Sequence, residues 1–195
     1  MVRPLVMTSS MYADITGETD PEELALMQVQ DREVAEQVAS VLSDLYGIES
    51  TLLEPREEEG IDIIVGTLGD IGLLRAIAAA MHGKTEADYQ EGRVPAGFQF
   101  NHLINHAGDS GYYVPVDFMQ AFVVGDVSVG SAVALLQELA ALEPVLAESY
   151  PEEYRVAVAA TDEDLVELEG PVGVWWALRQ LCRSAVELDL PVQLG

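Results

Sequence analysis

The sequence predicts an α+β fold, in which a mixed β-sheet packs against about four helices in a single domain over residues 1–195. Three observations lead to this prediction. The chain has 195 residues, of which 49% are apolar, so it can bury a core of its own. Segments with apolar residues at helical spacing alternate irregularly with short segments that favour strands. No repeat, low-complexity block or linker divides the chain.

The first helix is predicted over residues 31–46, because Asp31 is a good N-cap and Gly47 a good C-cap. Its apolar face is formed by Val34, Val38, Val41, Leu42 and Leu45. Asp20–Pro21 also has the pattern of a helix start, with proline at the first helical position. The short apolar segment that follows it stops at the next cap, however, so residues 24–30 are predicted to form a strand.

Two more short strands are predicted over residues 48–53 and 61–65, with a charged turn between them. A helix is predicted over about residues 69–82. Its inward face is formed by Ile71, Leu74, Ile77, Ala78 and Met81. Residues 84–97 are polar and contain glycine and proline, so we expect a surface loop.

The middle of the chain is predicted to be rich in strands. Phe98, Phe100 and His102 alternate, which favours a strand over residues 98–104. Further strands are predicted over residues 112–116 and 120–124.

The last third is predicted to hold two helices. Ser131 is the N-cap of the first, which Pro144 ends or kinks. Its inward face is formed by Leu135, Leu136, Leu139 and Leu142. The second covers about residues 171–187, and strands are predicted over residues 155–159 and 190–194. The apolar side chains of the last helix are Val174, Trp175, Leu178, Leu181, Cys182 and Ala185.

Acidic residues dominate the charge, with 34 Asp and Glu against 9 Lys and Arg, a net charge of −25. Clustered Lys and Arg are needed to bind phosphate, so nucleic acid and anionic membranes are poor partners. The acidity fits three interpretations: a solvated surface, as in a salty environment, a docking surface for a basic protein, or cation binding. No apolar run is long enough to span a membrane, and Cys182 stands alone. We therefore expect a cytoplasmic protein.

Two glycine motifs are interpreted as turns. Gly66-x-x-Gly69-x-x-Gly72 lacks the spacing of a dinucleotide fingerprint, and Asp70 would repel a phosphate. Gly108-Asp109-Ser110-Gly111 has the letters found around a protease nucleophile, but Asp and Ser between glycines are typical of turns.

His102, His106 and Asp109 form a candidate metal site. Two imidazoles and a carboxylate are ligands that suit a divalent metal such as Zn²⁺, and three protein ligands leave a position open for water. In a strand, the two histidines would be about 13 Å apart, so a bend between them is required. The alternative is that His102 is a hydrogen-bonded core residue and that His106 and Asp109 order the turn.

The same stretch supplies the candidate functional loop. Its members are His102, His106, Asp109, Ser110, Tyr112 and Tyr113. Tyr112, Tyr113 and Phe118 are either anchors for a partner or core residues with polar tips. The solvent exposure of Tyr112 distinguishes these alternatives.

The pattern His102-Leu-x-x-His106, followed by Asp109 and Gly111-Tyr-Tyr-x-Pro115, resembles a motif in small uncharacterised bacterial proteins. The resemblance covers the middle third and the last helix, and it implies a compact intracellular domain without assigned chemistry. In bulk character the chain also resembles bacterial immunity and antitoxin-like proteins.

These observations predict a non-enzymatic protein-binding module without a cofactor, with a basic protein as its partner. The alternative is a metal-dependent hydrolase that uses His102, His106 and Asp109.

Overall fold

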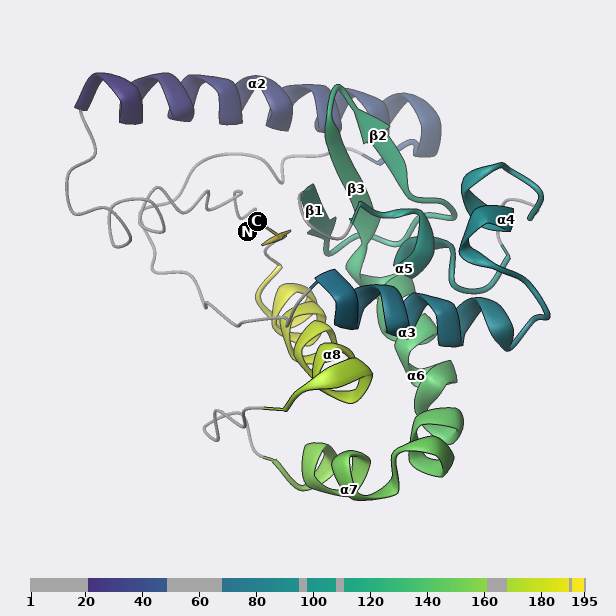
Figure 1. Cartoon of the computed structure of the whole chain (residues 1–195). Helices are drawn as coiled ribbons and strands as arrows, with labels where there is room; N and C mark the ends of the chain where they lie inside the picture. The colour runs from purple at the N-terminus through teal and green to yellow at the C-terminus, as the bar shows by residue number, and fades with distance from the viewer. Residues whose placement is uncertain are drawn as a thin grey trace.

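The computed structural model describes residues 21–48, 68–94, 98–107, 111–160, 168–189 and 191–194 (Figure 1). Seven helices lie in these ranges: α2 (Pro21–Tyr46), α3 (Leu68–Ala80), α4 (Glu86–Gln90), α5 (Asn101–Asn105), α6 (Ala132–Ser149), α7 (Pro151–Ala159) and α8 (Gly170–Leu188). Four strands accompany them: β1 (Gly111–Val114), β2 (Phe122–Val124), β3 (Val127–Ser131) and β4 (Val192–Leu194). The predicted α+β class is confirmed. The extent of the domain, residues 1–195, stays a prediction.

The four strands form one mixed sheet in the order β2-β3-β1-β4. β1 runs parallel to β3, and the other neighbours are antiparallel, as the prediction of a mixed sheet requires. Gly111 starts β1 with φ 118°, and a Cβ there would lie 2.2 Å from the carbonyl oxygen of Ser128. Only glycine fits this close approach of two backbones.

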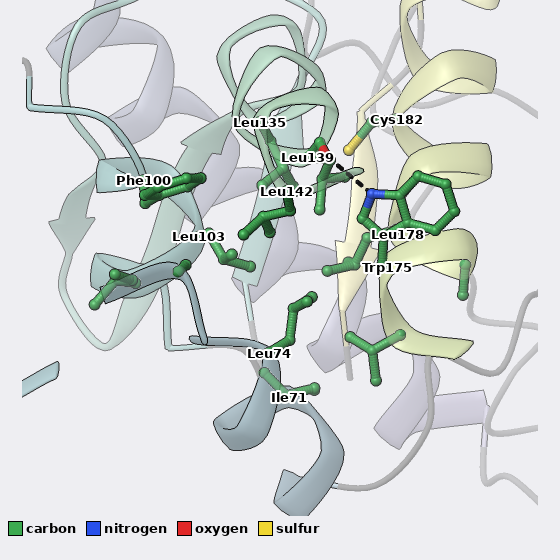
Figure 2. Packing of buried hydrophobic residues seen from close by; sticks show 14 of the residues in the cluster. Ile71, Leu74, Phe100, Leu103, Leu135, Leu139, Leu142, Trp175, Leu178 and Cys182 are labelled. Atoms are coloured by element: carbon green, nitrogen blue, oxygen red, sulfur yellow. Dashed lines mark hydrogen bonds between the residues drawn. The ribbon is translucent and has the colours of Figure 1, made fainter. Parts of the chain in front are cut away.

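Apolar clusters pack on both faces of the sheet. Side chains alternate along β1, so Tyr113 packs with the helices α3, α5, α6 and α8, whereas Tyr112 and Val114 pack with α2. Figure 2 shows the first cluster, in which Trp175 donates a hydrogen bond from Nε1 to the carbonyl oxygen of Leu139 at 2.8 Å. The larger core thus lies on the helical face, and α2 covers the other face alone among the described helices.

The helix α6 begins where predicted and runs further than expected. The Ser131 hydroxyl accepts the N–H of Ala134 at 3.0 Å, as an N-cap does. Pro144 lies inside the helix, which continues to Ser149. Both Pro144 and Ala140, whose carbonyl loses its helical donor, are exposed, so water can satisfy the freed oxygen.

Three predicted strand or loop segments are wrong. The strand over residues 24–30 is part of α2, which starts at Pro21. The strand over residues 155–159 is part of α7, with Pro151 at its first position. Proline at a helix start was therefore the stronger signal at both places. The loop over residues 84–97 contains α4.

The strand over residues 98–104 is also wrong, because α5 occupies its second half. Strand β3 and the capping box that starts α4 were not predicted: the Thr85 hydroxyl accepts the N–H of Asp88, whose carboxylate accepts the N–H of Thr85. Leu45 and Met81, expected to face inward, are 66% and 39% exposed. Two predicted strands cannot be compared with the structure: residues 49–53 of the first, predicted over 48–53, and all of the second, over 61–65, lie outside the described residues.

Candidate functional site

The stretch that sequence reasoning singled out contains α5, a buried helix of five residues. One carboxylate holds its start: Glu138 accepts the backbone N–H of His102 at 2.8 Å and that of Leu103 at 2.7 Å. One guanidinium holds its end: Arg75 donates to the carbonyl oxygens of Leu103, at 2.9 Å, and of His106. A helix this short leaves most of its backbone N–H and C=O groups without a hydrogen-bond partner inside the helix, so side chains distant in sequence must stabilise it.

Glu138 is 6% exposed, and burial raises the pKa of its carboxyl to about 8, although the backbone N–H groups that it accepts lower it. Sequence reasoning missed this residue. The signal was present, because Glu138 interrupts the inward face of α6 between Leu135 and Leu142. A carboxyl group on an apolar face needs buried hydrogen-bond donors.

His102 is a buried hydrogen-bonding link. Its Nδ1 accepts the N–H of Ser131 at 3.0 Å, so its Nε2 carries the proton and donates to the carbonyl oxygen of Phe118 at 2.9 Å. Burial lowers the pKa of His102 to about 4, which keeps the ring neutral. Tyr113 donates from its hydroxyl to the carbonyl oxygen of His102 at 3.0 Å.

His106 lies in a similar setting. Its ring stacks on that of Tyr113 with centroids 4.2 Å apart, and its Nε2 lies 3.2 Å from the carbonyl oxygen of Tyr112. Burial lowers the pKa of His106 to about 4 as well. Tyr112 and Tyr113 are 5% and 2% exposed, so they are core residues and not surface anchors for a partner.

Asp109 and Ser110, the other members of the candidate loop, lie outside the described residues, so the metal site of His102, His106 and Asp109 stays a prediction. Among the residues that the structure describes, no three His, Cys, Asp or Glu side chains gather in a way that could hold a metal ion. A metal on His102 would have to displace one of its two hydrogen bonds. The fit to a metal is therefore poor at this residue.

A second candidate site lies on the surface around α2. We define the acidic face as the exposed carboxylates of α2, of the β1–β2 loop and of the β2–β3 turn: Glu33, Glu36, Asp44, Asp117 and Asp126. α2 lies across the β2–β3 hairpin (Figure 1), and Val34, Val38 and Leu42 pack it onto the sheet. On its other side, the described side chains of Glu33, Glu36 and Asp44 are exposed to solvent.

The carboxylates of the acidic face form no ion pairs within the described part of the chain. Elsewhere, Arg93 pairs with Asp88 at 2.7 Å, Arg155 with Glu152 at 2.7 Å and Arg179 with Glu143 at 3.2 Å. These pairs neutralise part of the charge around α4, α6 and α7. Among the residues that the structure describes, no Lys or Arg side chain pairs with the carboxylates of the acidic face, so they are available to a positively charged partner.

A family model described as "Putative DNA-mimic protein" matches residues 30–194. The chain belongs to this family. Comparisons with curated proteins and with solved structures give no match. The match shows that the sequence belongs to a recognised family, as the resemblance implied, but not that the histidine motif carries it.

Membership of the DNA-mimic family supports the coarser functional prediction, a binding module. The partner prediction is wrong. It named a basic protein in general and set nucleic-acid recognition aside, whereas the DNA-mimic family implies DNA-binding proteins that accept the chain in place of DNA. The net charge of the chain gives the sign of the electrostatic field that a partner must complement. It does not give the shape of the surface that the partner recognises. Separately, none of the described helices combines the length and apolar composition of a membrane span.

Proposed function

We propose that this protein binds the DNA-contacting surface of a DNA-binding protein, with the acidic face in the place of the phosphate backbone. The observation that carries the proposal is the gathering of exposed carboxylates on and beside α2, none of which pairs with a described Lys or Arg, in a chain with net charge −25. Occupying that surface would keep the partner from DNA. This blocking role is of the kind that immunity and antitoxin-like proteins perform, and it requires a compartment that holds DNA, such as the cytoplasm.

The dimensions of α2 support the proposal. Its described carboxylates, from Glu33 to Asp44, span about 17 Å of the helix axis, which is about half of one turn of B-DNA at about 34–36 Å. Glu33 and Glu36 are separated by about 4.5 Å along the axis of α2. Successive phosphates of one DNA strand are separated by about 3.4 Å along the axis of the duplex. The carboxylates are sparser than phosphates overall, so the field of the whole chain must add to the local contacts.

The test is displacement of a short fluorescent duplex from purified DNA-binding proteins, with this protein as competitor. Two probes are used: a helix-turn-helix dimer that reads the major groove, and a minor-groove protein that kinks DNA with apolar wedges. The triple variant Glu33→Gln, Glu36→Gln, Asp44→Asn removes three charges from the acidic face. At about 0.2–1 kcal/mol for each exposed ion pair, it should compete between about threefold and about a hundredfold more weakly.

A matched control removes the same charge elsewhere. The control variant combines Glu148→Gln, Glu153→Gln and Glu187→Gln. These three glutamates lie on α6, α7 and α8, are exposed, and form no ion pairs with described residues. This variant should compete almost as well as the parent. The proposal fails if the parent displaces the duplex from neither probe. Equal loss in the two triple variants would also contradict it, since binding would then follow net charge without a defined face.

A further inference from the structure

The backbone of the β1–β2 loop, residues 115–121, is fixed by hydrogen bonds from side chains of other elements. The Ser131 hydroxyl donates to the carbonyl oxygen of Val116 at 2.6 Å, and His102 donates from Nε2 to that of Phe118 at 2.9 Å. Both donors are buried and come from other elements. The loop is therefore tied to the same polar centre that holds α5.

Two further bonds fix the second half of the loop. The hydroxyl of Tyr46, at the end of α2, donates to the carbonyl oxygen of Gln120 at 3.2 Å. The buried side chain of Asn101 accepts the N–H of Ala121 at 3.1 Å. Side chains from α2, α5 and β3 thus bind four backbone groups of a seven-residue loop, which limits its conformational freedom.

The firmly held loop presents one acidic and one apolar side chain to water. Phe118 is buried at 4% exposure, with its ring 5.2 Å from that of Tyr46. Asp117 and Met119, on either side of it, are exposed, and Met119 is 66% exposed. Only Leu45, which precedes Tyr46, is as exposed among the large apolar side chains that the structure describes. The most exposed apolar side chains thus lie at the edge of the acidic face.

We propose that Met119 is an apolar contact of the binding surface, and that it receives the apolar wedge of a DNA-bending, minor-groove protein. This inference rests on the proposed function and names its partner class. Such proteins bury Phe, Leu, Ile, Met or Pro between base steps, beside basic side chains that contact phosphates. A mimic made of carboxylates alone would leave the wedge in water. Methionine is flexible and polarisable, so it adapts to an apolar partner side chain.

Charge decides between this partner and the other possible occupants of the loop. A second copy of the chain carries −25 as well and would be repelled, as would an anionic membrane. A wedge flanked by Arg and Lys is attracted by Asp117 and Asp44 instead. Because the loop is already ordered, little conformational entropy is lost when the partner binds.

The experiment repeats the duplex displacement with the wedge protein and with the helix-turn-helix dimer as probes. Met119→Ser should compete about 5- to 30-fold more weakly against the wedge protein, since about two thirds of an apolar side chain would no longer be buried. This loss should persist at raised salt, because apolar burial is not screened. Met81→Ser, the same change at an exposed methionine after α3, should leave competition unchanged.

A second variant tests the role of loop order. Tyr46→Phe keeps the ring that packs on Phe118 and removes the hydrogen bond to Gln120. It should fold like the parent and compete about twofold to tenfold more weakly against the wedge protein, because a neutral hydrogen bond contributes about 0.5–1.5 kcal/mol.

The outcomes separate this inference from the proposed function. If the parent displaces DNA from the helix-turn-helix dimer but not from the wedge protein, the inference is overturned and the proposed function stands. Equal competition by Met119→Ser and the parent against the wedge protein also overturns it. So does sedimentation that shows the parent to self-associate through Met119, because the loss of competition in Met119→Ser would then reflect a second copy of the chain. Displacement from neither probe overturns the proposed function itself.

Discussion

Glu138→Gln should change the way stability depends on pH. The folded carboxyl has a pKa of about 8, against an ordinary value of 4.5, because burial disfavours the charged form. Between these values the folded protein holds a proton that the unfolded chain has released. The stabilising contribution is therefore complete below about pH 4.5, falls as the pH rises, and is lost above about pH 8.

The magnitude follows from the two pKa values. Their difference corresponds to about 5 kcal/mol over the whole range, of which about 3–4 kcal/mol is lost between about pH 5 and about pH 8. Glutamine has nearly the same shape but does not titrate, and its one oxygen cannot serve both the His102 and Leu103 N–H groups as the carboxyl does. It should cost about 1–3 kcal/mol at every pH. The variant should thus be the less stable protein at low pH and the more stable one at high pH.

Urea unfolding, followed by the fluorescence of the buried Trp175 and Trp176, measures both proteins across this pH range at constant ionic strength. Glu148→Gln, an exposed carboxyl on the same helix, controls for the removal of a charge. A stability difference between Glu138→Gln and the parent that stays within about 0.5 kcal/mol from low to high pH would refute the buried-carboxyl account.

Two further predictions concern the core and the net charge. Leu178→Ala removes a side chain that is 3% exposed and should destabilise the protein by about 2–5 kcal/mol in the same urea assay, whereas Leu73→Ala, at 45% exposure, should stay within about 0.5 kcal/mol; a small loss at Leu178 would place this side of α8 in solvent. With a net charge of −25, the melting temperature should rise from low to moderate salt, because charges repel over about 30 Å at 0.01 M; an unchanged melting temperature would mean that the charges are already compensated.

The elements that the sequence predicted well are those that local signals define. α8 has Pro171 in its first turn and carries a clear apolar face, with Trp175, Leu178 and Cys182 all buried as expected. α6 was placed by its Ser131 cap. In both helices, the caps and the apolar spacing agree with the final packing, so short-range patterns are enough.

α5 could not be predicted in the same way. Its pattern of alternating Phe98, Phe100 and His102 favours a strand, and the helix forms because Glu138 and Arg75, distant in sequence, bind its two ends. Tertiary contacts here override local preference. The histidines were recognised as unusual for the same reason: they are buried polar links, and a sequence cannot distinguish such links from metal ligands.

The sequence predicts only part of the acidic face. The net charge of −25 follows directly from the sequence, and a docking surface was among the interpretations of that charge. Which carboxylates keep their charge depends on where the arginines lie, and Arg155 and Arg179 neutralise Glu152 and Glu143 through folding. The kind of partner depends on a shape that charge counts do not contain.

The position of β1 in the sheet has a consequence for how the chain is made. β1 is central, yet both strands that flank it come later in the chain: β3 after the β1–β2 loop, and β4 only after α8. During synthesis, one side of β1 therefore stays without its partner until Val192 has emerged from the ribosome. Pairing between segments so distant in sequence is slow. Until it is complete, the nascent chain presents an unpaired edge that invites aggregation, and its dense negative charge would then repel other nascent copies.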